Sequence, residues 1–285
     1  MSKLHVLACL DSERMAEARQ QELQIPGDVA AGLGQSAVKA AQEGFYLTRA
    51  GQVIVWRDAV QTARAIKQSI AVNTLLATNE RGAFEETIVQ VTNETTLGAS
   101  LRLVKRGLRP IALNFANGFQ PGGGFLMGAT AQEEVLCRSS ALYHTLIGDP
   151  MYEEHRRLQL PDSSDRAIYS PNVPVFRMDD GTELESPWLL SFITCAAPYA
   201  PAVGQPQAGD LLKQRIHRCA GHCTRVRIRC ADSRCMGLWC LPERCATYCY
   251  RFSSCLGTGV RRSVLRSGLC HSRLVTREKV PRAFL

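Results

Sequence analysis

Three consecutive glycines, Gly122 to Gly124, are followed seven residues later by Gln132, Glu133 and Glu134. Glycines leave the backbone free of Cβ obstruction, so their amides can approach a ligand closely. A helix N-terminus beside such a loop suits an anion such as a diphosphate. Two neighbouring carboxylates provide for glycosidic cleavage, which needs an acid for the leaving oxygen and stabilisation of an oxocarbenium-like transition state. The spacing matches neither a P-loop nor the dinucleotide fingerprint GxGxxG.

The same glutamates have a purely structural interpretation. Thr130 stands three residues before Glu133, which is the spacing of a capping box at a helix start. Glu134 could then lie on the solvated surface. The helix dipole favours ionised carboxylates here, which opposes a protonated acid unless burial or a substrate phosphate outweighs it. The spacing alone leaves the capping and catalytic interpretations of Glu133 open.

The elements around this segment alternate between strands and helices. The patterns predict helices over 12–44 (interrupted at Pro26 and Gly27), 58–76, 95–106 and 131–147. They predict strands over 87–92, 111–116, 166–170 and 188–195, and a hairpin over 45–56. This alternation favours an α/β fold with a mixed sheet. The glycine loop then follows the carboxyl end of a strand, where ligands bind in such sheets.

The full motif extends beyond the glycines and glutamates. It reads GGG-x7-QEE, with NFAN before it and CRSSALY after it. This pattern resembles the catalytic motif of the microbial-type poly(ADP-ribose) glycohydrolases, which are macrodomain enzymes. The resemblance runs from about residue 12 to about 218 and includes VTNETTL at 91–97 and YSPNVPVFR at 169–177. It implies a three-layer α/β/α macrodomain with a mixed sheet and an N-terminal helical extension.

The resemblance also implies an activity and a set of site residues. The expected reaction is hydrolysis of the ribose–ribose O-glycosidic bond of poly(ADP-ribose), with ADP-ribose as product. Glu134 would be the catalytic acid/base, and Glu133 and Asn117 would orient the terminal ribose. Gly122, Gly123 and Gly124 would lie near the diphosphate, and Gln132 of the same motif is expected to bind ligand. We expect no metal and no cofactor.

Three further residues invite functional interpretations. Tyr169 and Phe176 could stack on adenine, but aromatic residues near strands more often belong to the core. Cys137 has no evident histidine partner, so we expect a buried helix residue and not a nucleophile.

The last 67 residues differ from the rest of the chain. Residues 219–285 contain 13 Lys and Arg against 3 Asp and Glu, and 9 of the 12 cysteines. The preceding residues contain 21 basic and 23 acidic side chains. Successive cysteines in this tail form no CxxC pair, so a zinc site is poorly supported. A disulfide framework conflicts with the absence of an evident signal peptide.

A shifted reading frame accounts for the tail better. Back-translated and read one base later, Cys235–Cys245 permits AWGCGAFRND, a small-residue loop of the kind that the family uses at the diphosphate. The same frame permits a helix, a turn and a strand over 219–235, and a strand over 268–284. We therefore predict a frameshifted translation that begins near Arg218. The expected organisation is an N-terminal helical extension (1–80), an incomplete macrodomain core (81–218) and an anomalous tail (219–285) that adds no strand to the sheet.

Other functions and the location follow from the remaining features. An ADP-ribose-binding macrodomain without activity and a mono-ADP-ribosyl hydrolase are alternatives. A nucleic-acid-binding protein that uses the basic tail is a third alternative. The frame hypothesis removes the reason for it, because the basic residues would not be part of the native protein. We expect partners to be poly(ADP-ribose) or ADP-ribosylated proteins, with no membrane and no specific nucleic acid. No apolar run reaches the roughly 18 residues of a membrane span, so we expect a cytoplasmic protein.

Overall fold

The computed structural model describes residues 3–74, 86–158, 163–229, 235–241 and 273–276. The chain divides into two compact units. The first comprises residues 1–19, 75–112 and 204–285, and the second comprises 20–74 and 113–203. Strand β6 (Arg109–Ala116) passes from the first unit into the second. Every candidate site residue predicted from the sequence belongs to the second unit.

The first unit contains a mixed sheet with the strand order β1-β5-β10-β9-β6. Parallel pairs are β1 with β5 and β9 with β6, whereas β10 runs antiparallel to both of its neighbours. Helix α4 begins after Thr95, whose side chain accepts a hydrogen bond from the Gly98 amide at 2.9 Å. Besides β6, the helices and strands of this unit are β1 (Lys3–Val6), β5 (Glu86–Thr92), α4 (Thr96–Lys105), α9 (Gln207–Arg229), β9 (Cys235–Leu241) and β10 (Arg273–Thr276).

The tail contributes two strands to this sheet. Strand β9 pairs with β6 over Arg109–Ala112, and β10 lies between β9 and β5. The prediction that the written tail adds no strand is therefore wrong for these two segments. Strand pairing uses main-chain groups, so short apolar runs such as CMGLWCL can occupy a place in a sheet whatever their origin. The frame hypothesis itself stays a prediction, and most of the tail lies outside the described residues.

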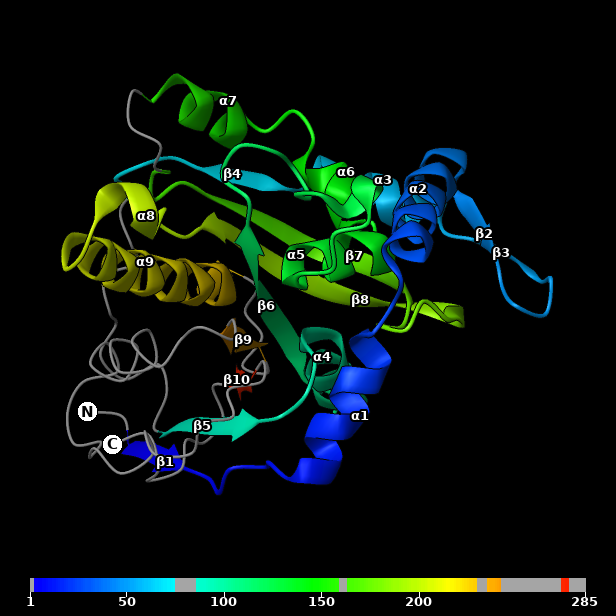
Figure 1. Ribbon diagram of the computed structural model, residues 1–285, viewed down its shortest axis with the longest axis horizontal. Helices are drawn as coiled ribbons and strands as arrows, with labels where there is room; N and C mark the ends of the chain where they lie inside the picture. Colours follow the sequence, from blue (N-terminus) through cyan, green and yellow to red (C-terminus); the bar gives the residue numbers. More distant parts are fainter. Residues whose placement is uncertain (1–2, 75–85, 159–162, 230–234, 242–272, 277–285) are drawn as a thin grey trace. The chain divides into compact units, whose positions relative to one another are not determined.

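The second unit contains the strand order β6-β8-β7-β4 and most of the helices. Strands β7 (Ala167–Arg177) and β8 (Glu183–Ala196) form its long antiparallel pair, and β4 (Gln68–Ile70) adds to β7. Helices α3, α5 and α6 pack on β7, and α2 packs on α5, as Figure 1 shows. The helices are α2 (Gly27–Glu43), α3 (Arg57–Ala65), α5 (Gln132–Ser139), α6 (Leu142–Leu146), α7 (Pro150–Arg157) and α8 (Ala200–Val203).

Smaller elements complete this unit. The short 3-10 helix η1 (Phe125–Met127) follows the glycine loop, and β2 (Phe45–Leu47) and β3 (Val53–Val55) form the predicted hairpin. The boundary between residues 1–19 of the first unit and residues 20–74 of the second falls within helix α1 (Glu13–Leu23). The mixed α/β class predicted from the sequence is confirmed, while the predicted boundaries near 80 and 218 stay predictions.

Two of the predicted helices are wrong in extent. The helix predicted over 58–76 ends at Ala65, because Gln68–Ile70 pairs with β7 instead. The helix predicted over 131–147 is broken after Ser139, where Ser140 forms a β-bridge to Val175. The Ser140 hydroxyl also donates to the Leu136 carbonyl at 2.7 Å, which satisfies a carbonyl left open by the break.

Aromatic side chains form part of the core of the second unit. Phe176 is fully buried and its ring lies 4.6 Å from that of Trp56 and 5.0 Å from that of Tyr46. Tyr169 is also buried. The core interpretation of Tyr169 and Phe176 therefore holds in preference to adenine stacking.

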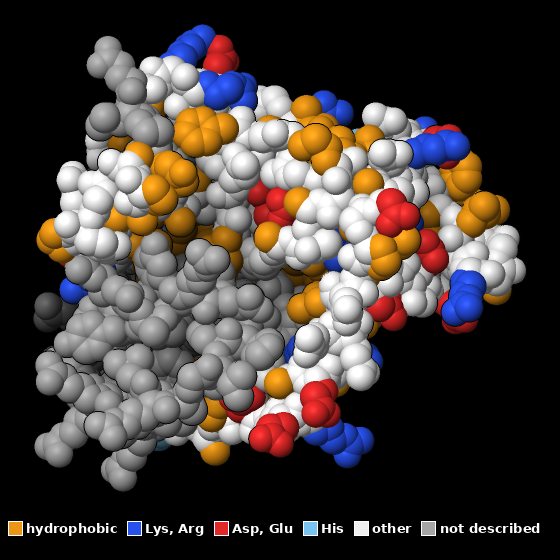
Figure 2. Space-filling view, in the orientation of Figure 1, with side chains coloured by type: hydrophobic (Ala, Val, Ile, Leu, Met, Phe, Trp, Pro, Cys, Tyr) orange, Lys and Arg blue, Asp and Glu red, His pale blue; other side chains and the backbone are white. Residues whose placement is uncertain are grey.

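Exposed apolar side chains are spread over several elements. Figure 2 shows them as separate orange groups on one face, and the most exposed large one is Met127 at 77%. Within the described ranges, no helix has the length and apolar character needed to cross a membrane.

Candidate active site

The glycine loop brings the backbone against the two glutamates. Gly122 and Gly123 have φ values of 72° and 55°, which favour glycine. A Cβ on Gly122 would lie 2.9 Å from the Phe125 ring, and a Cβ on Gly123 would collide with the Glu134 carboxylate. Glycine is therefore required at positions 122 and 123 by close packing as well as by backbone conformation.

Glu133 is held by the loop and by strand β6. Its Oε2 accepts a hydrogen bond from the Asn117 amide at 2.7 Å. Its Oε1 accepts from the Gly122 amide at 3.2 Å and from Asn114 Nδ2 at 3.3 Å. Helix α5 is preceded by Ala131, with no side-chain cap, so the capping-box interpretation of Glu133 is wrong. The carboxylate instead joins three separated parts of the loop and strand.

The environment of Glu133 changes its titration. Burial raises the pKa of Glu133 to about 7, and the nearby charge of Glu134 acts in the same direction. Hydrogen bonds from the Asn117 amide, the Asn114 side chain and the Gly122 amide act in the opposite direction. Its charge therefore changes near neutral pH.

The Glu134 carboxylate accepts fewer hydrogen bonds than the Glu133 carboxylate. The residue is 8% exposed, and its Oε1 accepts a hydrogen bond from the Gly124 amide at 3.0 Å. Its Oε2 accepts no hydrogen bond from any residue that the structure describes. One oxygen is thus fixed by the loop, and the other is available to a substrate atom.

Gln132 connects helix α5 to strand β6. Its Oε1 accepts from the Phe115 amide at 2.9 Å, and its Nε2 donates to the Leu113 carbonyl at 2.7 Å. The side-chain amide therefore binds the strand as a neighbouring strand would. This contact sets where Glu133 and Glu134 emerge.

The amides of the glycine loop already have partners inside the protein. The Gly122 and Gly124 amides donate to the two glutamates, and the Gly123 amide donates to the Gln120 carbonyl at 3.1 Å. In this conformation the loop orients the carboxylates. Its proximity to a diphosphate stays a prediction.

Asn117 lies exposed at the end of β6. Its Oδ1 accepts hydrogen bonds from the Phe119 and Gln120 amides at 2.9 and 3.0 Å. Its Nδ2 donates to no residue in the described part of the chain, which leaves a donor beside the glutamates.

Comparisons with known proteins identify the family of this chain. The family "Microbial-type PARG, catalytic domain" matches residues 34–178, which include the whole loop and both glutamates. The poly(ADP-ribose) glycohydrolase (PARG) of Thermomonospora curvata is 31% identical with a TM-score of 0.69, over 85% of this chain and 88% of that chain. This chain belongs to the microbial-type PARG family.

Two further structures extend the comparison to bound ligands. The Thermomonospora curvata PARG bound to the inhibitor ADP-HPD is 30% identical with a TM-score of 0.64, over 80% of this chain and 85% of that chain. A Deinococcus radiodurans PARG mutant in complex with ADP-ribose is 32% identical with a TM-score of 0.50, over 59% and 71%. A search of curated proteins gave no match.

The structure adds residues to the PARG site that the sequence analysis did not single out. Arg138 is 1% exposed, and its three guanidinium nitrogens make no hydrogen bond to any residue that the structure describes. Burial lowers its pKa, and the charges of Asp179 and Glu134 oppose that change. Its position four residues after Glu134 on one helix is the signal that could have identified it. Asn114, which contacts Glu133, is the first residue of the NFAN segment, but the sequence analysis gave it no role.

Other side chains near the PARG site have no evident catalytic arrangement. Cys137 is 1% exposed, and burial raises the pKa of its thiol, as expected for a structural cysteine. Among the described residues, no group of three His, Cys, Asp or Glu side chains could hold a metal ion.

Replacing Gly123 with alanine should strongly reduce turnover. The new Cβ would collide with the Glu134 carboxylate and displace it. Gly51→Ala is the matched control, because Gly51 has a φ of 79° but no atom within 4 Å of its Cβ. Steady-state kinetics should show a loss only for Gly123→Ala, and equal activities would contradict the role of this contact. Calorimetry tests separately whether a diphosphate lies against the loop. If it does, Gly123→Ala and Gly123→Val should both weaken ADP-ribose binding.

Proposed function

We propose that this protein is a poly(ADP-ribose) glycohydrolase in which Glu134 is the general acid/base. The observation that carries the assignment is the difference between the two carboxylates. Both oxygens of Glu133 accept hydrogen bonds from the loop and strand, whereas Glu134 keeps Oε2 available. Family membership supports the choice of substrate.

The reaction assigned to Glu134 is an acid-assisted cleavage followed by hydrolysis. Protonated Glu134 donates its proton to the ribose–ribose glycosidic oxygen as the bond from that oxygen to the anomeric carbon breaks. The anomeric carbon gains oxocarbenium character. Water then adds to this carbon and transfers a proton to the Glu134 carboxylate, which restores the acid. The products are ADP-ribose and a shortened polymer.

A titration argument alone would choose Glu133 as the acid, because its pKa is raised to about 7. Geometry opposes that choice. A general acid needs an oxygen within hydrogen-bond reach of the leaving group, and the Glu133 oxygens face three N–H donors of the protein. We therefore assign Glu133, together with Asn117, to orienting the terminal ribose.

The remaining site residues have supporting roles in this proposal. Gln132 places the start of α5 against β6, and the Gly122 and Gly124 amides hold the two carboxylates. All three glycines, Gly122, Gly123 and Gly124, lie near the diphosphate in this proposal. The partners are poly(ADP-ribose) or ADP-ribosylated proteins. A cytoplasmic location, inferred from the sequence, belongs to the same proposal.

Product analysis tests the function. Incubation with poly(ADP-ribose) should release ADP-ribose, whereas a mono-ADP-ribosylated protein should stay modified. Release from the mono-modified protein alone would indicate a mono-ADP-ribosyl hydrolase. Binding of ADP-ribose with no product from either substrate would indicate a binding module and contradict the proposal. The written chain and the frame-corrected chain should be assayed in parallel.

A further inference from the structure

Helix α7 contacts the loop that carries Asn117. The His155 ring is fully buried, and its Nδ1 lies 2.9 Å from the Gly118 carbonyl oxygen. The next residue, Arg156, donates from Nη1 to the Phe119 carbonyl at 2.5 Å. Two consecutive residues of one helix therefore hold two consecutive carbonyls of the loop Asn117–Gln120.

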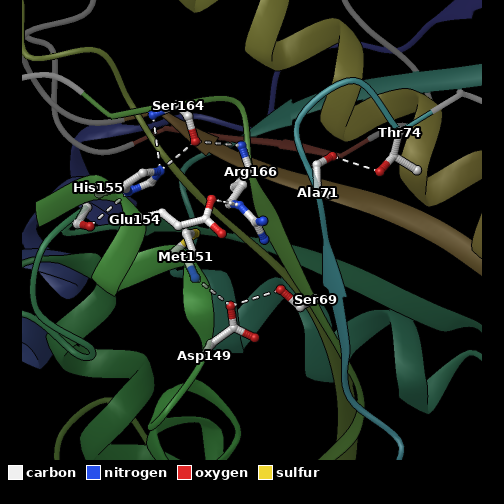
Figure 3. Close-up of polar contacts among 10 residues, drawn as sticks. Ser69, Ala71, Thr74, Asp149, Met151, Glu154, His155, Ser164 and Arg166 are labelled. Carbon is white, nitrogen blue, oxygen red and sulfur yellow. Dashed lines mark hydrogen bonds and ion pairs between the residues drawn. The ribbon is translucent and has the colours of Figure 1, made fainter. Parts of the chain in front are cut away.

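The tautomer of His155 follows from its partners. The backbone N–H of Ser164 lies 3.0 Å from Nε2 and can only donate, so Nε2 is the acceptor. The ring proton therefore sits on Nδ1 and is donated to the Gly118 carbonyl. Figure 3 shows Ser164 beside the His155 ring, and the Ser164 hydroxyl also lies 2.7 Å from Nε2.

Helix α7 is itself fixed near both ends. Asp149, at its start, accepts from the Met151 amide and from the Ser69 hydroxyl, each at 3.0 Å. Near its other end, Glu154 pairs with Arg166 at 2.5 Å, as Figure 3 shows. A helix held in this way can fix the position of a loop that it contacts.

The loop has little room to move toward α7. A Cβ on Gly118 would lie 3.1 Å from Ser163 Cβ and 3.4 Å from His155 Nδ1. On the other side of Gly118, the Asn117 amide donates to Glu133 at 2.7 Å. A chain of contacts therefore runs from His155 through Gly118 and Asn117 to the glutamate pair.

We propose that His155 is a positioning residue for ADP-ribose binding: by holding the Gly118 carbonyl, it fixes the loop so that the side-chain amide of Asn117 faces the ligand. Because Asn117 Oδ1 is engaged by the Phe119 and Gln120 amides, Asn117 offers the ligand a donor, Nδ2, and contacts an acceptor oxygen. This inference rests on the ribose-orienting role given to Asn117 in the proposed function.

Two conservative replacements distinguish the contributions of the two ring nitrogens of His155. His155→Asn keeps a donor near Nδ1, and His155→Gln keeps an acceptor near Nε2. His155→Ala should raise the Kd for ADP-ribose and the KM for polymer about tenfold, the value of one net hydrogen bond, with a smaller change in kcat. His155→Asn should restore most of the affinity, and His155→Gln should not.

Tyr46→Phe is the control for a general loss of stability. It removes one partly buried hydrogen bond elsewhere in the same unit, from the tyrosine hydroxyl to the Leu184 carbonyl at 2.7 Å. It should lower Tm and leave the Kd unchanged. A Tyr46→Phe variant with a Kd raised as far as that of His155→Ala would overturn a specific role for His155.

The measurements use the full chain produced from its native gene, with calorimetry for Kd, steady-state kinetics for KM and kcat, and Asn117→Ala as reference. If Asn117→Ala weakens binding and His155→Ala does not, or if His155→Asn restores nothing, the inference fails and the proposed function stands. If Asn117→Ala leaves the Kd unchanged, the ribose-orienting role fails, and the inference fails with it.

Discussion

Replacing Glu134 with glutamine should lower the turnover of poly(ADP-ribose) by about 10²–10⁴-fold, the usual contribution of general acid–base catalysis. Glutamine keeps an Oε1 that can accept from the Gly124 amide, so the loop keeps its contact. It carries no proton that it can give to a leaving oxygen. The loss should therefore appear in kcat, measured by release of ADP-ribose, while ADP-ribose affinity by calorimetry is kept.

Two variants complete this experiment. Glu133→Gln places an amide against the N–H groups of Asn117 and Gly122, so we expect weaker ADP-ribose binding as well as lower turnover. Glu43→Gln changes an exposed carboxylate of α2 and should behave as wild type. Turnover of Glu134→Gln close to the wild-type value would rule out Glu134 as the acid.

The second large effect concerns residues 219–285. Under the frame hypothesis, the native protein departs from the written sequence near Arg218, and its mass differs from the 31.4 kDa of the written chain. Peptides from residues 1–218 should match the written sequence, and peptides from the tail should not. A thiol titration in denaturant should find far fewer than 12 cysteines, because 9 of them lie in the tail.

Hydrolysis of poly(ADP-ribose) should depend on which reading frame encodes the tail. The frame-corrected tail supplies a small-residue loop for the diphosphate, so that chain should fold and cleave polymer. The written chain should be poorly soluble and inactive, because its cysteine- and arginine-rich tail does not supply this loop. A native mass of 31.4 kDa together with hydrolysis of poly(ADP-ribose) would disprove the frame hypothesis.

The sequence predicted the elements whose patterns are local. The strand before Asn117, the hairpin over 45–56 and the helix after Thr95 all form where the periodicity and capping residues place them. The motif located Glu133 and Glu134 at the start of a helix, and the structure confirms that position.

What the sequence did not predict depends on contacts between distant segments. Strand β4 exists because Ser69 pairs with Ile168, a partner almost a hundred residues away, which local helix periodicity could not reveal. The break at Ser140 likewise depends on Val175. The distinction between Glu133 as a cap and as a loop anchor required the positions of Asn114 and Gly122, since both interpretations fit the same spacing.

The burial of Glu133 has a consequence for proton linkage. With a pKa of about 7 in the folded protein against an ordinary glutamate pKa of 4.5, this residue binds more protons when folded than when unfolded across that interval. The free energy of unfolding therefore falls as pH rises from about 4.5 through about 7, by up to roughly 3 kcal/mol from this group. The contribution of this carboxylate to the free energy of unfolding is thus smallest at the pH values where the carboxylate is fully charged.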